Sequence, residues 1–156
     1  MKLYLLRHAK TNQQSPTGKD FDRRLLPKGH AQCALMEKHL EGTQDLHILC
    51  SSAQRTRETL KGIDLSNMYI EFRDDLFLCS RDTLLKAIWG CKSDKDLMII
   101  GHNFGISDLA EYLLEDYIKM RTCELLVFDF EIDNWQEVSK GLGVLTDRFR
   151  PVPKDF

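Results

Sequence analysis

The chain has 156 residues, a formal net charge of −2, 42% hydrophobic residues and 29% charged residues. These values are typical of a soluble globular protein, and the length suits one domain with a substantial core, which we expect to span residues 1–156. The nearly balanced charge, without a basic run, argues against nucleic acid or an anionic membrane as a partner. No apolar stretch approaches the length of a membrane span.

The N-terminus and the cysteines favour a reducing compartment. The first apolar residues are interrupted by Arg7, His8 and Lys10, which does not fit a signal peptide. The cysteines are odd in number and form no Cys-x-x-Cys pair, which argues against a disulfide framework or a structural zinc site. They are Cys33, Cys50, Cys79, Cys91 and Cys123. We therefore expect a cytoplasmic, monomeric protein.

Strands alternate with helices in the first half of the chain. Residues 2–6 predict a short apolar strand, and residues 11–27 predict a long polar loop of a kind that is usually functional or mobile. A helix is expected over residues 27–41. Residues 46–50 predict the next strand, and a short helix follows over residues 53–61.

The same alternation continues in the second half. Residues 68–72 predict a weaker strand, and residues 80–90 predict a helix. The continuous apolar run at residues 96–100 is typical of a strand covered on both faces. Residues 106–114 have the clearest helical spacing of apolar side chains, and residues 125–130 predict another strand.

Two weaker features follow this last strand. Residues 135–139 could pair with it as an antiparallel edge, and the tail from Arg148 predicts an extended surface strap. The alternation of strands and helices indicates an α/β sandwich with a largely parallel sheet. In such a sheet the carboxyl ends of the strands meet at one edge, where ligands bind.

Basic side chains lie where three of these strands end. Arg7 and His8 follow the first strand, Arg55 lies just past the second, and His102 follows the strand at residues 96–100. We therefore expect these four side chains to meet. Arginine contacts phosphoryl oxygens with a planar, permanently charged fork, so Arg7 and Arg55 can clamp a phosphoryl group and neutralise charge in the transition state.

A histidine at such a site can act as a nucleophile. A neutral imidazole attacks phosphorus when one ring nitrogen is free and the other is held by an acceptor, and nearby cations favour this neutral form. His8, beside Arg7, suits this role, and a protonated His102 could hold a phosphoryl oxygen. Water would then hydrolyse the phosphohistidine intermediate. Alone, each histidine would more simply be a turn residue; together with the arginines they predict a site.

Three stretches, at residues 6–11, 51–59 and 101–103, resemble the motifs of the histidine phosphatase superfamily. The short chain and the stretches at residues 20–23 and 75–77 resemble its phosphohistidine phosphatase branch, the SixA-like proteins. The resemblance implies a phosphoglycerate mutase-like fold. This is a three-layer α/β/α sandwich whose mostly parallel mixed sheet contains one antiparallel strand.

The resemblance also implies roles for single residues. His8 would be the phosphorylated nucleophile, and Arg7, Arg55 and His102 would form its phosphate pocket, with no metal or organic cofactor. Ala9 stands where the broader superfamily has the glycine of its Arg-His-Gly motif, and alanine is common there in the SixA-like branch.

Further site residues are candidates only. Thr11 and Asn103 could bind the phosphate or the substrate, although Thr11 could equally stabilise its turn. Larger superfamily members carry an inserted segment with an acidic proton donor over the site, and residues 72–84 leave little room for one. Asp75 or Asp74 could be a proton donor, but a solvated turn is the simpler interpretation.

The missing insert favours one substrate class. An alkyl phosphate ester needs a proton delivered to a poor leaving oxygen, whereas the P–N bond of a phosphoramidate is more labile and its nitrogen can be protonated from solvent. We therefore expect phosphohistidine in a partner protein as the substrate. A small phosphate ester or a nucleotide, cleaved by the same mechanism, is the alternative.

Other classes of protein fit the sequence less well. A binding module that only holds phosphorylated ligands would not need all four core residues. A metal hydrolase using His8 and His102 lacks carboxylates at ligand spacing. A cysteine phosphatase needs an arginine after five intervening residues, and the count from Cys50 ends on Thr56.

Overall fold

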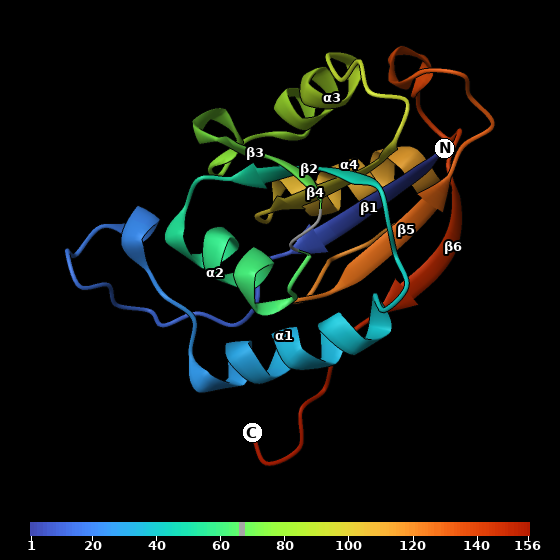
Figure 1. The fold of residues 1–156 in the computed structure, drawn as a ribbon. Helices are drawn as coiled ribbons and strands as arrows, with labels where there is room; N and C mark the ends of the chain where they lie inside the picture. The colour runs from blue at the N-terminus through green and yellow to red at the C-terminus, as the bar shows by residue number, and fades with distance from the viewer. Residues whose placement is uncertain (66–67) are drawn as a thin grey trace.

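The computed structural model describes residues 1–65 and 68–156 and has a mixed sheet between two layers of helices (Figure 1). Within these ranges one six-stranded sheet is formed, with the strand order β3-β2-β4-β1-β5-β6. Its strands are β1 (Lys2–Arg7), β2 (Leu46–Ser51), β3 (Tyr69–Arg73), β4 (Asp96–Gly101), β5 (Leu125–Asp129) and β6 (Val144–Phe149). Strands β1 to β4 pair in parallel, and β5 runs antiparallel to both of its neighbours. This is the expected mixed sheet with one antiparallel strand.

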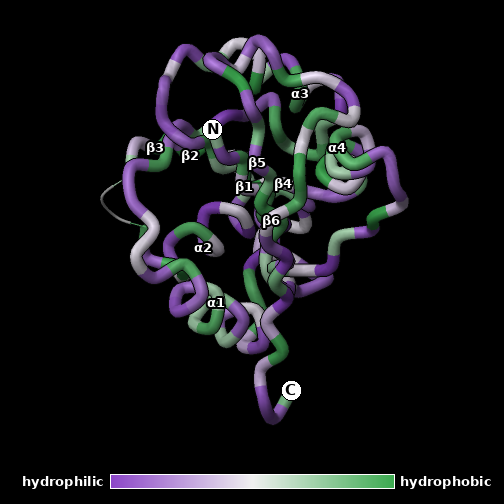
Figure 2. The backbone as a smooth tube through the Cα atoms, turned by 90° about the vertical axis from the view of Figure 1, so that its right-hand side faces the viewer, coloured by the Kyte–Doolittle hydropathy of each residue, from purple (hydrophilic) through white to green (hydrophobic). Residues whose placement is uncertain are grey.

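Two helices cover each face of the sheet. In Figure 2, α1 (Pro27–His39) and α2 (Gln54–Gly62) lie on one side of the strands, and α3 (Arg81–Trp89) and α4 (Gly105–Leu114) lie on the other. The two outer layers complete the α/β/α sandwich. None of the helices in the described ranges has the length and apolar character needed to cross a membrane.

The central strand β4 shows why the apolar run at residues 96–100 is continuous. Because side chains alternate across a strand, Leu97 and Ile99 point to the core under α3 and α4, whereas Met98 and Ile100 point to the core under α1 and α2. All four side chains are fully buried. A strand covered on both faces has no solvent-facing positions, so polar residues do not alternate with apolar ones.

The expected antiparallel edge at residues 135–139 is wrong. Trp135–Glu137 form a short 3₁₀ helix instead, capped by Asn134, whose side chain accepts a hydrogen bond from the Gln136 N–H. Trp135 is fully buried, and its indole N–H donates to the Lys95 carbonyl at 3.2 Å. The edge strand is β6, so the first two residues of the expected tail, Arg148 and Phe149, belong to the sheet. Beyond them residues 150–153 have no regular secondary structure, and Lys154 and Asp155 form a turn.

Candidate active site

The predicted basic residues meet at the carboxyl edge of the parallel strands. Arg7 ends β1, the next residue is His8, Arg55 lies in the first turn of α2, and His102 follows β4. These four side chains line one cavity of about 300 Å³. The strand pairing explains the convergence, because Arg7 is in register with Gly101, the last residue of β4.

His8 is held on both sides by backbone. Its N–H donates to the Gly101 carbonyl at 3.1 Å, and its carbonyl accepts from the Cys123 N–H at 2.9 Å. The ring nitrogen Nδ1 lies 2.8 Å from the carbonyl oxygen of Ala9. Because a carbonyl can only accept, Nδ1 must carry the hydrogen, and Nε2 of the neutral ring keeps a free lone pair. The local fold therefore presets the tautomer that nucleophilic attack requires.

His102 faces His8 across the cavity. The centroids of the two rings are 5.3 Å apart, and the ring planes are tilted by 53°. His102 Nε2 lies 2.8 Å from the Ser51 hydroxyl, and Phe77 meets the ring edge-on. The segment before α3 comes this close because α4 begins at Gly105, where a Cβ atom would clash with the Cys79 carbonyl oxygen.

Burial keeps both histidines neutral. The pKa of His8 is lowered from 6.5 to about 3, first by burial and further by His102, Arg55 and Arg7, which outweigh the Ala9 hydrogen bond. The pKa of His102 is lowered to about 3 by burial, Arg55 and Arg7, against the opposing charge of Asp20. A protonated His102, which could hold a phosphoryl oxygen, is therefore not the form present in the free site at neutral pH. A bound phosphate would favour protonation.

These shifts predict how the two rings titrate. A group whose pKa is lowered from 6.5 to about 3 stays neutral at every pH well above 3. The imidazole signals of His8 and His102, followed by nuclear magnetic resonance, should therefore not shift toward the imidazolium position between pH 8 and pH 5. The variants His8→Gln and His102→Gln assign the two signals. A titration midpoint near 6.5 for either ring would contradict the arrangement described.

The two arginines approach the cavity from different elements, Arg7 from the end of β1 and Arg55 from the first turn of α2. Arg7 Nη1 donates to the Met120 carbonyl at 3.1 Å, and its buried Nε has no partner among the described residues. Arg55 is only 2% exposed, and its Nη1 and Nη2 donate to the carbonyl and the carboxylate of Asp20 at 2.8 and 3.0 Å. Asp20 thus occupies the Nη1–Nη2 edge of the guanidinium in the free site. A phosphoryl group that uses this edge must displace Asp20.

Asp20 is the site residue that the sequence analysis missed. It lies in the loop at residues 11–27, and its carboxylate is also paired with Arg23 at 2.9 Å. Burial alone would raise the pKa of Asp20, but the hydrogen bonds and charges of Arg23 and Arg55 outweigh it and lower the pKa. The carboxyl is therefore ionised and cannot serve as an acid. The motif at residues 20–23 pointed to this segment, but nothing in its spacing pointed to Arg55.

Thr11 and Asn103 also line the cavity. The Thr11 hydroxyl accepts from Arg23 Nη2 at 2.6 Å, so Thr11 holds the loop as well as facing the site. The Asn103 amide nitrogen donates to the Met120 carbonyl at 3.0 Å, and its oxygen accepts from the Ser107 hydroxyl. Both side chains already have partners that position the turns around His8 and His102.

Asp74 and Asp75 do not line the cavity. Both belong to the short 3₁₀ helix Asp74–Leu76 and are exposed. The Asp75 carboxylate accepts from Arg73 at 2.7 and 3.0 Å, and this hydrogen bonding lowers its pKa. A general acid needs a raised pKa. The structure therefore places these two residues in a solvated turn and not over the histidines.

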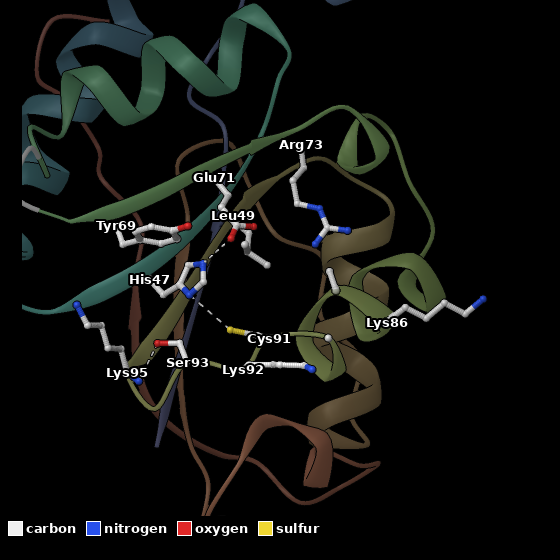
Figure 3. Close-up of a pocket in the computed structure, with 12 residues that line it drawn as sticks. His47, Leu49, Tyr69, Glu71, Arg73, Lys86, Cys91, Lys92, Ser93 and Lys95 are labelled. Carbon is white, nitrogen blue, oxygen red and sulfur yellow. Dashed lines mark hydrogen bonds and ion pairs between the residues drawn. The ribbon is translucent and has the colours of Figure 1, made fainter.

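A separate cavity, of about 550 Å³, lies between β2, β3 and α3 (Figure 3). There His47 on β2 has its Nδ1 3.6 Å from Cys91 Sγ and its Nε2 3.3 Å from the Glu71 carboxylate. Burial raises the pKa of the Cys91 thiol. None of the four predicted site residues lines this cavity. Over residues 1–65 and 68–156, no three His, Cys, Asp or Glu side chains are grouped closely enough to hold a metal ion.

The chain is similar to known proteins along most of its length. The sequence model of the histidine phosphatase superfamily (branch 1) matches residues 3–77. An uncharacterised chloroplast protein of Arabidopsis thaliana is 30% identical over 151 residues, which cover 87% of this chain and 69% of that protein.

Two solved structures assigned as the phosphohistidine phosphatase SixA share the fold. The one from Agrobacterium tumefaciens is 25% identical, with a TM-score of 0.81 over 96% of this chain and 97% of that chain. The one from Nakamurella multipartitia is 23% identical, with a TM-score of 0.83 over 97% and 96%. With its phosphoglycerate mutase-like sandwich, the chain thus belongs to the SixA-like branch of the histidine phosphatase superfamily and is a phosphatase of that type.

Proposed function

We propose that this phosphatase removes the phosphoryl group from phosphohistidine in a partner protein, through a covalent intermediate on His8. One observation carries the proposal. His8 has its Nδ1 bonded to the Ala9 carbonyl and its Nε2 free, in a cavity shared with Arg7 and Arg55. A neutral nucleophile beside two fixed cations suits attack on a negatively charged phosphoryl group.

The reaction has two steps. His8 Nε2 attacks phosphorus, a new N–P bond forms, and the P–N bond of the substrate breaks while its leaving nitrogen takes a proton from solvent. Water then attacks the phosphorus of phospho-His8, which releases orthophosphate and restores the imidazole. Arg7 and Arg55 bind the phosphoryl oxygens as their charge is redistributed in each transition state. Asp20 must leave Arg55 before that guanidinium is fully available.

The acid–base properties of the cavity favour a phosphoramidate over an ester. Asp20 is the carboxylic acid that lines it among the described residues, and its lowered pKa keeps it ionised. An alkoxide leaving group would therefore lack a proton donor. The nitrogen of phosphohistidine takes its proton from water, so the same cavity suffices. This argument supports a protein-bound phosphohistidine as the substrate and a small phosphate ester as the poorer alternative.

Substrate profiling tests this proposal. We expect the kcat/KM of the wild-type protein for a phosphohistidine-bearing carrier protein to exceed that for serine phosphate and sugar phosphates by at least about 100-fold, the usual scale of a missing general acid. The assay measures released orthophosphate, with the carrier protein phosphorylated chemically and with a chelator present in a parallel series. Equal or faster turnover of the esters would contradict the proposal.

A further inference from the structure

A second cavity, of about 310 Å³, adjoins the candidate active site directly. The two cavities share Arg7, Lys10 and Thr122 in their linings, so they lie side by side with these three residues between them. The second cavity extends from these residues past Lys28, at the start of α1, to the segment after β6. A substrate whose phosphoryl group lies at His8 would therefore continue into it.

Cations dominate this cavity. No side-chain carboxylate of the described residues lines it, although the whole chain carries more acidic than basic residues. In the described part of the chain none of its cations takes part in an ion pair. We call the set the basic groove: Arg7, Lys10, Lys28, Arg121 and Arg150.

The nearby carboxylate of Glu124 acts on Arg7 through its charge, but among the described residues its ion pair is with Arg148 and not with a cation of the basic groove. Its side chain is buried, and it accepts hydrogen bonds from Arg148 Nε at 2.7 Å and from the Arg121 backbone N–H at 2.6 Å. These two hydrogen bonds hold the Glu124 carboxylate between the Arg121 backbone and the Arg148 side chain. The guanidinium of Arg121 itself is left facing solvent. A concave surface lined by one sign of charge concentrates counter-ions of the opposite sign.

Buried contacts hold the groove in shape. The Gln32 side chain is buried, accepts from the Lys10 backbone N–H at 2.9 Å and lies within 3.3 Å of the Thr122 hydroxyl, to which it donates. Gly29 lets α1 approach the Lys10 carbonyl, where a Cβ atom would clash. Lys10 and Lys28 are thereby fixed beside each other. Pro151, which is buried, anchors the chain next to Arg150.

We propose that the basic groove binds acidic side chains that lie close to the phosphohistidine in the partner protein. This proposal rests on the proposed function, because it identifies the kind of protein segment that the active site receives. The cavity has room for a short peptide segment, and the exposed side chains of Val152 and Phe156 at its rim can pack on the apolar atoms of that segment. Nucleic acid would need a more extended positive surface, which a chain of net charge −2 does not favour.

The test compares two synthetic phosphohistidine peptides, one with Asp and Glu around the histidine and one with Asn and Gln at the same positions. The wild-type protein should show a kcat/KM for the acidic peptide about 10-fold higher or more, mainly through a lower KM, and high salt should reduce this preference. The double variant Lys28→Glu/Arg150→Glu should lose the preference. Glutamate is tolerated at position 28 because it lies in the first turn of a helix.

A matched control carries the same change in charge elsewhere. The double variant Lys92→Glu/Lys95→Glu alters two exposed loop lysines at the cavity of about 550 Å³ between β2, β3 and α3, and should keep the preference. Phosphoramidate is too small to extend from His8 to Lys28 or Arg150, so both double variants should lose far less activity on it than Lys28→Glu/Arg150→Glu loses on the acidic peptide. Equal use of the two peptides by the wild-type protein, or an unchanged preference in Lys28→Glu/Arg150→Glu, would overturn the groove.

A binding measurement separates this proposal from the proposed function. Fluorescence polarisation gives the affinity of the protein for unphosphorylated forms of the same two peptides, in the absence of turnover. Charge-dependent binding without hydrolysis of either phosphopeptide would keep the groove and refute the proposed function. Hydrolysis of both phosphopeptides at equal rates would support the proposed function and refute the basic groove as a site for acidic side chains. If a small bisphosphate inhibited hydrolysis of the acidic phosphopeptide and the unphosphorylated acidic peptide did not, the proposal that the groove binds peptides would also be refuted.

Discussion

Replacing His8 with alanine should lower kcat/KM for a phosphohistidine-bearing protein by at least about 10⁴-fold, the scale seen when a covalent nucleophile is removed. The variant keeps Arg7, Arg55 and His102, but it loses the nitrogen that forms the bond to phosphorus. The lost nitrogen is the free Nε2 of His8, which depends on the contact of its own Nδ1 with the Ala9 carbonyl. The measurement is release of orthophosphate under single-turnover and steady-state conditions.

The covalent intermediate supplies a second readout for the same variant. Wild-type protein mixed with a radiolabelled phosphohistidine substrate and quenched in alkali should carry label that is stable to base and labile to acid, as expected of phosphohistidine. His8→Ala should carry none. His30→Ala is the matched control, because His30 is exposed on α1 and does not line the cavity. Undiminished labelling or turnover in His8→Ala would refute the assignment of the nucleophile.

Replacing Arg55 with alanine should lower kcat/KM by about 10³-fold, the upper range for losing one preorganised donor to a developing charge. Arg55 is only 2% exposed, so its side chain is confined by packing and little is lost in ordering it when the phosphoryl group replaces Asp20. Arg55→Lys should recover part of the activity, because it restores the charge but not the planar fork. Steady-state kinetics on the same carrier protein measure both variants.

Arg57→Ala provides the control for Arg55. Arg57 lies on the same helix, but its guanidinium stacks over Phe72 at 4.0 Å and donates to the Ser52 carbonyl, away from the cavity. The cation–π contact replaces the salt bridge that such a position usually suggests. Activity near the wild-type value is expected for Arg57→Ala. If Arg55→Ala also remained within tenfold of wild type, its role in transition-state stabilisation would be refuted.

The regular helices and strands could be predicted from the sequence because the spacing of their apolar residues reflects which faces of each element are buried. The run at residues 96–100 is apolar at every position because β4 is covered on both faces, and the spacing in α4 follows from its single buried face. Trp135 shows the limit of such reasoning. A short segment with a large apolar residue fits a strand or a turn, and the decision depended on a buried contact with Lys95, 40 residues away.

The candidate site divides in the same way. The sequence alone determined that Arg7, His8, Arg55 and His102 meet, because the ends of parallel strands share one edge whatever the loops do. Only the tertiary structure decided that Asp20 occupies Arg55 and that Asp75 is paired with Arg73, since ion pairs between loops depend on how the loops fold back. It also decided that the tail after β6 brings Arg150 to the groove beside Lys10. Contacts between loops leave no periodic pattern of apolar residues in the sequence, so the sequence alone does not reveal them.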